Sequence, residues 1–186
     1  MSQTYKIAFI GEPGSGKTTC IAALSRIKPL NTDVGCTDEL LQLKETTTVA
    51  LDYGELDLDD GGRLQLYGLP GQARFRFMFD VVRDGLIGVV LLVDATSPTG
   101  FDGFSETLTV YAEELRCVPF VVALNKHVGM PAGLPEAVQM RLRESQLPAP
   151  ILTVDARHRP DMARIAKMLF TLLDYNRFVA IPEEEA

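Results

Sequence analysis

The chain contains four short runs of apolar residues, at 5–10, 86–93, 119–124 and 150–154. None of them alternates apolar with polar positions, as a strand with one face in water would. Continuous apolar character is typical of parallel strands that are covered on both faces. These runs are therefore predicted to be central strands of one sheet.

Between these runs, apolar residues recur at spacings of three and four, which predicts helices. The positions are Phe104, Leu108, Tyr111 and Leu115 in one segment, and Met162, Ile165, Ala166, Leu169, Phe170 and Leu173 in another. Pro160 and Asp161 suit the entry of the second helix, because proline fits a first turn and an acid complements the helix dipole. Alternating strands and helices predict a doubly wound α/β fold with helices on both faces of a parallel sheet.

Residues 47–58 and 63–67 are also strand-like, but only the turn at 59–62 separates them. That turn is too short for a crossover helix, so the pair is predicted to form an antiparallel hairpin. The apolar residues fall at odd-numbered positions at Leu51 and Tyr53 but at even-numbered positions at Leu56 and Leu58. A β-bulge at Gly54 is therefore expected, because it would return both sets of side chains to one face of the strand. Residues 28–46 have little periodicity and are predicted to form a long loop.

Composition narrows the class of protein. The chain has 186 residues, of which 46% are hydrophobic and 23% charged, as expected for one globular domain. Its net charge of −7 predicts no nucleic-acid partner. Three cysteines without a paired spacing suit reduced thiols, and no signal peptide, lipidation motif or long apolar run is present. A cytoplasmic protein without direct membrane insertion is expected.

Residues 11–18 read GEPGSGKT, a complete G-x-x-x-x-G-K-[ST] phosphate-binding loop between a predicted strand and a helix. Glycines let the backbone N–H groups point inward at a polyphosphate, and the helix N-terminus favours negative charge. Lys17 would reach the outer phosphates, and the Thr18 hydroxyl would ligate Mg²⁺. The candidate phosphate-binding residues here are Gly11, Gly14, Ser15, Gly16, Lys17, Thr18 and Thr19.

Two further segments separate GTPases from other phosphate-loop proteins: residues 45–53, ETTTVALDY, and residues 66–75, LYGLPGQARF. In this order they resemble switch I and switch II. The sequence is similar to bacterial Ras-like small GTPases, in particular the conservon-type group related to the gliding-motility GTPase. The resemblance implies a single Ras-like domain over 1–178 with a mostly parallel six-stranded sheet, followed by an acidic tail at 179–186.

The resemblance also implies roles in the switch segments. Thr48 would ligate Mg²⁺ and sense the γ-phosphate, with Thr47 as the alternative. Gly71 would offer its backbone N–H to the γ-phosphate. Gln72 would be the catalytic residue that orients the attacking water.

Two positions depart from the Ras pattern. Gly68 stands where Ras has the aspartate that opens switch II and supports Mg²⁺, which implies a weaker metal shell. Asp52 or Asp94 would compensate through water, although Asp94 is more simply a loop-capping residue. Pro13 stands where Ras has a glycine whose replacement affects function. Proline has no N–H, so the rate of GTP hydrolysis would either rise or fall.

The motif that reads the base is incomplete. Asn125 and Lys126 match the start of N-K-x-D, but the final aspartate is Val128. A site without that acceptor loses its main discrimination for guanine. The candidate base-binding residues are Asn125, Lys126, Asp155, Ala156 and Arg157. Asp155 is the candidate to substitute for the missing carboxylate, and capping of the final helix is its simpler role.

The function expected from the resemblance is a molecular switch that binds GTP or GDP with Mg²⁺ and hydrolyses GTP slowly. Its partner by resemblance is a roadblock/LC7-type regulator, acting as GTPase activator or scaffold. Arg74 and Arg76 are candidates for an internal arginine finger or, more simply, for partner contacts. The alternatives are a catalytically weak nucleotide-loaded scaffold with relaxed base specificity and, less favoured, a small-molecule kinase.

Overall fold

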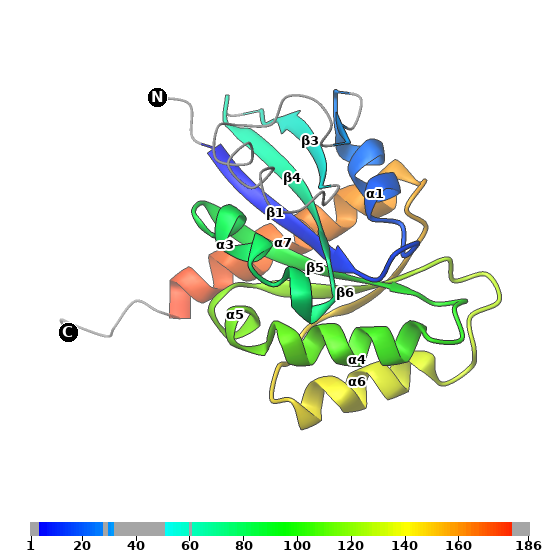
Figure 1. The fold of residues 1–186 in the computed structure, drawn as a ribbon. Coiled ribbons are helices and arrows are strands. Elements are labelled where there is room, and N and C mark those ends of the chain that lie inside the picture. The colour runs from blue at the N-terminus through cyan, green and yellow to red at the C-terminus, as the bar shows by residue number, and fades with distance from the viewer. Residues whose placement is uncertain (1–3, 28–29, 32–50, 60, 180–186) are drawn as a thin grey trace, which may run out of the picture.

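The computed structural model describes residues 4–27, 30–31, 51–59 and 61–179. Seven strands form one sheet in the order β2-β3-β4-β1-β5-β6-β7 (Figure 1). They are β1 (Thr4–Gly11), β2 (Leu30–Asn31), β3 (Asp52–Asp57), β4 (Arg63–Pro70), β5 (Leu86–Asp94), β6 (Phe120–Asn125) and β7 (Ile151–Val154). β4, β1, β5, β6 and β7 run parallel, and β3 is antiparallel to β4. The predicted fold is confirmed, and the two-residue β2 extends its edge.

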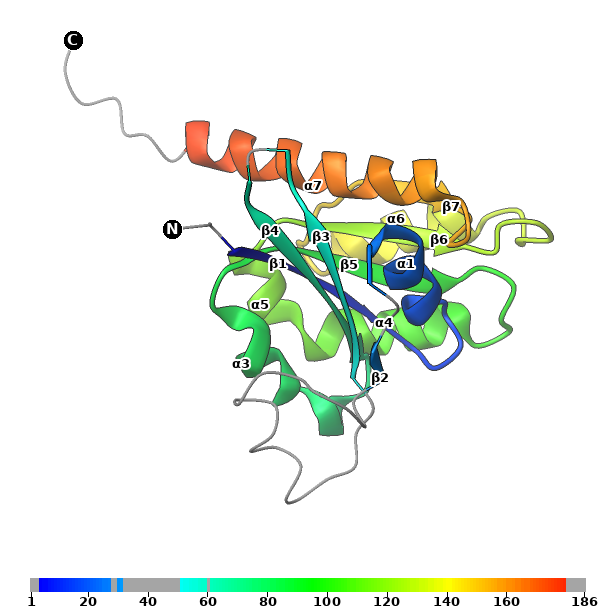
Figure 2. The ribbon, with the colours of Figure 1, turned by 90° about the horizontal axis from the view of Figure 1, so that it is seen from above.

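Helices cover both faces of the sheet (Figure 2). One face carries α1 (Lys17–Leu24) and α7 (Arg159–Val179). The other carries α3 (Met78–Arg83), α4 (Gly100–Val110), α5 (Ala112–Cys117) and α6 (Leu134–Glu144), and a short 3₁₀ helix, η2 (Ala73–Phe75), precedes α3. None of the helices in the described ranges is long and apolar enough to span a membrane.

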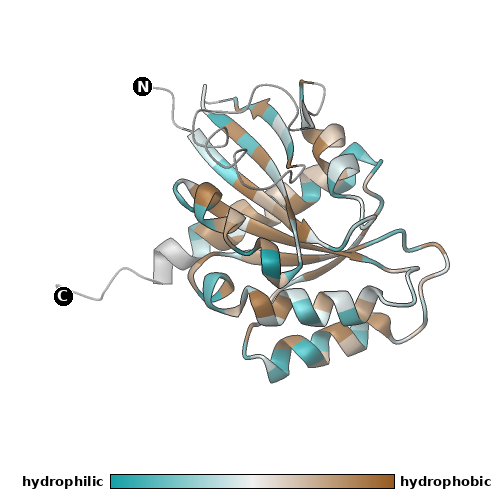
Figure 3. Cartoon of the chain, in the orientation of Figure 1, coloured by the Kyte–Doolittle hydropathy of each residue, from teal (hydrophilic) through white to brown (hydrophobic). Residues whose placement is uncertain are grey.

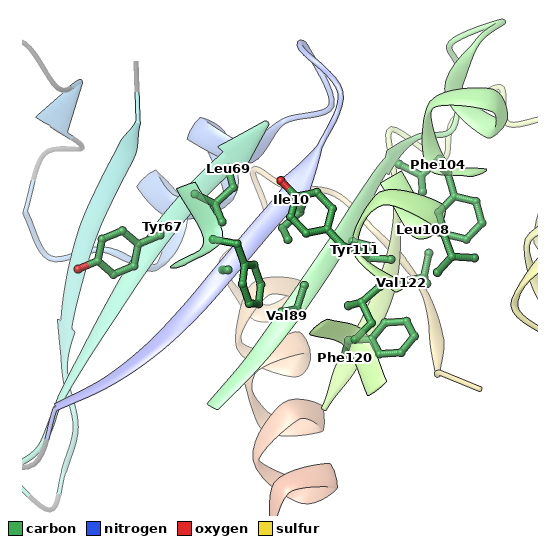
Figure 4. Packing of buried hydrophobic residues seen from close by; sticks show 14 of the residues in the cluster. Ile10, Tyr67, Leu69, Val89, Phe104, Leu108, Tyr111, Phe120 and Val122 are labelled. Atoms are coloured by element: carbon green, nitrogen blue, oxygen red, sulfur yellow. The ribbon is translucent and has the colours of Figure 1, made fainter. Parts of the chain in front are cut away.

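Each central strand contributes to two hydrophobic clusters, one on each face. In β1, Ala8 and Ile10 pack toward α4, whereas Ile7 and Phe9 pack toward α1 and α7. β5 and β6 are accordingly apolar along most of their length, whereas β3 and β4 carry hydrophilic bands and the helices show polar outer faces (Figure 3). Tyr111 and Phe104 are among the side chains that fill the α4 side (Figure 4). Burial on both faces explains why the sequence shows apolar runs without alternation.

The predicted bulge at Gly54 is wrong. β3 and β4 pair without interruption from Asp52 opposite Gly68 to Asp57 opposite Arg63. Tyr53 packs on the α4 side of the sheet and Leu56 on the α1 side. The apolar positions shift from odd to even because β3 buries one face near its start and the other face further along. Glycine is needed for another reason, because a Cβ at position 54 would lie 2.6 Å from Cγ2 of Ile21 in α1.

The helical periodicities are borne out for both segments. The four predicted apolar residues of the first segment are buried in α4, in α5 and at Tyr111 between them. In α7, Asp161 lies in the first turn and its Oδ2 accepts a hydrogen bond from the Asp155 N–H at 3.0 Å. The predicted tail 179–186 lies outside the described residues except for Val179, and so does the predicted loop 28–46 except for β2.

Candidate functional site

The loop at residues 11–18 joins the end of β1 to the start of α1, as predicted. Gly16 has a φ of 107°, a conformation that side chains rarely adopt, and a Cβ there would lie 2.4 Å from Nδ2 of Asn125. Ser15, within the loop, is fully buried, while Thr18 and Thr19 are exposed on the first turn of α1. The loop therefore sets backbone N–H groups of a helix N-terminus at the sheet edge, where an anion is favoured.

Lys17 lies across this loop. Its ammonium donates hydrogen bonds to the carbonyl oxygens of Gly11 and Glu12, both at 2.9 Å. Burial lowers the pKa of Lys17, and the nearby carboxylates of Asp52 and Glu12 oppose that shift. A partly buried cation and a helix N-terminus without a side-chain cap thus meet at one point, which is the arrangement that polyphosphates bind.

Asn125, the last residue of β6, braces the loop from the side. Its Nδ2 donates to the Ser15 carbonyl at 2.8 Å, and its Oδ1 accepts from the Ala156 N–H at 2.9 Å. The side chain is 3% exposed, so both bonds are shielded from water. Asn125 therefore ties the β1–α1 loop to the segment that follows β7.

Lys126 makes a second brace. Its ammonium donates to the Gly14 carbonyl at 2.9 Å and to Oδ2 of Asp94 at 2.6 Å. The other oxygen of Asp94 accepts from the N–H and hydroxyl of Thr96, as expected for a loop-capping residue. Burial acts to raise the pKa of Asp94, but the hydrogen bonds from Lys126 and Thr96 lower it overall.

The groups expected to read the base already have partners. The Asp155 carboxylate accepts three hydrogen bonds from Arg157, from its backbone N–H, Nε and Nη2, and these hold the pKa of Asp155 well below its ordinary value. The Ala156 N–H is directed to Asn125. Val128 is 84% exposed and offers no polar atom. Residues 125–128 carry no carboxylate, and the predicted substitute, Asp155, is paired with Arg157.

The Thr18 hydroxyl donates to Oδ2 of Asp52 at 2.7 Å. Asp52 begins β3 and lies directly opposite Gly68 of β4. Asp94, the other residue expected to support a metal, is instead held by Lys126 and Thr96. The structure thus brings one of the two candidate carboxylates to the hydroxyl that was predicted to ligate Mg²⁺, and Thr48 lies outside the described residues.

The segment after β4 begins against the phosphate loop. The Gly71 N–H donates to the Gly11 carbonyl at 3.1 Å. Gln72 is only partly covered by neighbouring residues, and its Oε1 accepts from Arg74 at 3.0 Å. Met78 and Phe79 are buried while Phe77 is 40% exposed, so the aromatic run 75–79 divides between core and surface.

Helices α4 and α5 hold this segment in place. The Tyr111 hydroxyl donates to the Pro70 carbonyl at 2.9 Å, and Arg76 donates to Glu114 and Glu113, both at 2.8 Å. Sequence analysis identified Tyr111 only as a core residue and missed Glu113 and Glu114. Nothing local could have found them, because the partners of Arg76 are 37 and 38 residues away.

A cavity of about 260 Å³ lies beside the phosphate loop, between the ends of β1 and β5 and helix α4. Glu12 and Thr107 line it, and the Oε1 atom of Glu12 and the hydroxyl of Thr107 are both buried without a hydrogen-bond partner among the described residues. Sequence analysis did not identify either residue. The cavity is continuous with the loop and is part of the same site.

The sheet order, the glycine-rich β1–α1 loop and its braces from Asn125 and Lys126 define this chain as a Ras-like P-loop NTPase. The solved structure of the bacterial selenocysteine-specific elongation factor EF-Sec has the same fold, with a TM-score of 0.61 at 18% identity. The match covers 94% of this chain and 29% of that factor.

The chain belongs to the family described as conserved hypothetical ATP binding protein, which matches residues 32–185. It is 26% identical over 115 residues to Ras-related protein RABA2a of Arabidopsis thaliana, covering 60% of this chain and 46% of that protein. It is 22% identical over 183 residues to Ras-related protein SEC4 of Saccharomyces cerevisiae, covering 95% of this chain and 80% of SEC4. These findings agree with the Ras-like resemblance, and the conservon-type group stays a prediction.

Proposed function

We propose that this protein is a small GTP-binding switch that binds GTP or GDP with Mg²⁺, hydrolyses GTP slowly and thereby controls a protein partner. The observation that carries the proposal is the braced phosphate loop, with Lys17 across it and the Gly71 N–H against it. Its phosphate-binding residues would be Gly11, Gly14, Ser15, Gly16, Lys17, Thr18, Thr19 and Gly71. The similarity to Ras-related proteins supports a Ras-like site, and guanine nucleotide as the ligand is what that resemblance implies.

The residues present suit Mg²⁺. The ion prefers oxygen ligands and is commonly held by few protein groups together with nucleotide phosphates. Thr18 offers an exposed hydroxyl at the first turn of α1, and an anionic carboxylate lies next to it. Thr18 and Thr48 would hold the ion, and a bound Mg²⁺ would neutralise charge on the phosphates.

Hydrolysis would depend on positioning rather than on covalent chemistry. Gln72 would orient the attacking water, and the Gly71 N–H would exchange its bond to Gly11 for one to the γ-phosphate. Arg74 and Arg76 have partners in Gln72 and in Glu113 and Glu114, so neither is free to act as an arginine finger in this arrangement. Turnover would therefore be slow without a partner.

The partner would distinguish the GTP-bound from the GDP-bound state by the conformation of residues 45–48 and 68–80. The exposed Phe77 and the partly covered Gln72 and Phe75 offer a surface on this segment. By resemblance, the partner is a roadblock/LC7-type regulator. A cytoplasmic location stays a prediction.

A second candidate function is a catalytically weak scaffold with relaxed base specificity. The engaged Asp155 carboxylate and the apolar, exposed Val128 favour it, and so does the family description, which names ATP. A site that offers no unpaired polar group to the base would accept guanine and adenine nucleotides alike.

The first experiment is chromatographic identification of the nucleotide released when protein purified with Mg²⁺ is denatured, followed by competitive binding of GDP and ADP. Guanine preference together with phosphate release that Gln72→Ala abolishes would support the switch. Equal affinities and no phosphate release, unchanged in Gln72→Ala, would favour the scaffold. Lys17→Ala, which removes the loop cation, is the control for binding at this loop.

A further inference from the structure

Thr18 and Asp52 are 34 residues apart in sequence, yet the Thr18 hydroxyl donates its proton to Oδ2 of Asp52 at 2.7 Å. Thr18 lies in the first turn of α1 and Asp52 is the first residue of β3. With the hydroxyl proton directed at Asp52, the oxygen keeps its lone pairs for another partner. This geometry suits a hydroxyl that ligates a cation.

The side chain of Asp52 also fills the space beside Gly68. The two residues are direct neighbours in the antiparallel β3–β4 pair. A Cβ at position 68 would lie 2.9 Å from Cβ of Asp52 and 3.0 Å from its Oδ2. Cδ1 of Ile21 would be 3.3 Å away on the α1 side. A side chain at position 68 would therefore force Asp52 or its strand to shift.

In the described part of the chain, the other carboxylates near the phosphate loop form no hydrogen bond with Thr18. Asp94 is bonded to Lys126 and Thr96, and Glu12 packs its side chain against Gly103 of α4. Asp52, in contrast, acts on the phosphate loop itself, since its charge is the main influence that raises the pKa of Lys17 against burial. Within the described residues, Asp52 is the carboxylate bonded to Thr18.

The structure assigns to Asp52 the role of the carboxylate that supports nucleotide-bound Mg²⁺ beside Thr18, in place of the carboxylate that position 68 lacks. In this chain the supporting carboxylate lies on β3, at the residue that faces position 68 of β4, and it is within reach of the Thr18 hydroxyl. Asp52 is thus a positioning residue for the ion and for Thr18. The assignment rests on the proposed function, because the ion would arrive with the nucleotide.

The first test is the Mg²⁺ dependence of nucleotide release. Fluorescent N-methylanthraniloyl-GDP is loaded on the wild type and on Asp52→Asn, and its release is followed as Mg²⁺ is varied and then chelated. Asp52→Asn keeps the shape of the side chain and removes the charge. The Mg²⁺ concentration that half-maximally slows release is expected to rise about 10- to 100-fold, as for other residues that support metal ligands.

The matched control is Asp57→Asn on the same strand. Asp57 is exposed and pairs with Arg26 and Arg63, away from Thr18. This variant is expected to keep the Mg²⁺ dependence of the wild type. Circular dichroism and thermal unfolding of each variant separate a loss of Mg²⁺ support from a loss of fold.

The second test moves the carboxylate back. Gly68→Asp alone places two carboxylates and two Cβ atoms in the space of one, so it is expected to destabilise the protein and weaken nucleotide retention. Adding Asp52→Gly relieves both the crowding and the repulsion. The double variant is expected to recover most of the Mg²⁺-dependent retention that Asp52→Gly alone loses.

The outcomes distinguish the two proposals. If the wild type retains no nucleotide at any Mg²⁺ concentration, the proposed function fails and the role of Asp52 fails with it. If the wild type shows Mg²⁺-dependent retention and a folded Asp52→Asn variant matches it, only the assignment of Asp52 is overturned. A shift in Asp52→Asn with recovery in the double variant would support it.

Discussion

Arg76 and Glu114 form an ion pair in which the two partners differ in exposure. Nε of Arg76 lies 2.8 Å from Oε1 of Glu114, whose side chain is 6% exposed, whereas that of Arg76 is 45% exposed. The pair joins the segment after β4 to helix α5. The carboxylate depends on the arginine, because a buried charge without a partner is costly.

Arg76→Ala is therefore expected to lower Tm clearly, since it leaves the Glu114 carboxylate buried and unpaired. Adding Glu114→Gln should recover part of the loss, because a neutral amide costs less to bury than a charge. Thermal unfolding by circular dichroism measures both variants. Arg83→Ala, which removes an exposed pair with Asp80, should change Tm little. Equal effects of Arg76→Ala and Arg83→Ala would contradict the role of the buried carboxylate.

Asn125→Ala is expected to lower the free energy of unfolding by about 2 to 4 kcal/mol, because the buried Ser15 carbonyl and Ala156 N–H both lose their partner. Nucleotide affinity should fall as well, since the loop loses its lateral brace. Urea unfolding measures the first effect and competitive nucleotide binding the second. Gln139→Ala, at an exposed position of α6, should stay within about 0.5 kcal/mol of the wild type. A similar small change in Asn125→Ala would show that the two bonds contribute little.

Val128→Asp is expected to raise the preference for GDP over ADP about 10- to 100-fold, because a charged acceptor would regain the hydrogen bonds to guanine that valine cannot make. The ratio of the two dissociation constants, measured by competition, tests this. Val128→Asn, similar in size but uncharged, should give a smaller gain. An unchanged ratio in Val128→Asp would mean that the base lies elsewhere.

Cys20 gives a prediction for the dependence of stability on pH. Burial raises the pKa of its thiol from 9.0 to about 12 in the folded protein, so the unfolded chain loses this proton first as the pH rises. The stability linked to Cys20 is fully present below pH 9.0 and is lost between there and about pH 12. Within that range the wild type should lose up to roughly 1.4 kcal/mol per pH unit more than Cys20→Ala. Urea unfolding of both proteins at about pH 8 and about pH 10.5 measures the difference, and parallel losses would refute the prediction.

Much of the fold could be predicted because burial on both faces leaves a continuous apolar signal in the central strands. The phosphate loop could also be predicted, since its chemistry requires particular residues close together in the sequence. Helix α6 was missed because only Val138 and Leu142 are buried in it, which is too sparse for a clear period. Gly54 was misinterpreted because the close approach of Ile21 comes from another element.

The site was predictable only where its parts are contiguous. Asn125 and Lys126 could be identified from their match to N-K-x-D, and the structure places both side chains against the loop. The engagement of Asp155 by Arg157 and of Arg76 by Glu114 depends on side-chain geometry that no spacing encodes. Asp52 could be named as one of two candidates, but only the strand register places it opposite Gly68.

That register has a consequence for how the two positions can vary among homologues. Because Asp52 occupies the volume that a side chain at position 68 would need, position 68 cannot gain a side chain while Asp52 stays as it is. A carboxylate at position 68 should be accompanied by a small residue at position 52, and a carboxylate at 52 by glycine at 68. The two positions should therefore covary as a unit, and an ancestor that exchanged one arrangement for the other is expected to have passed through a sequence with no acid at either.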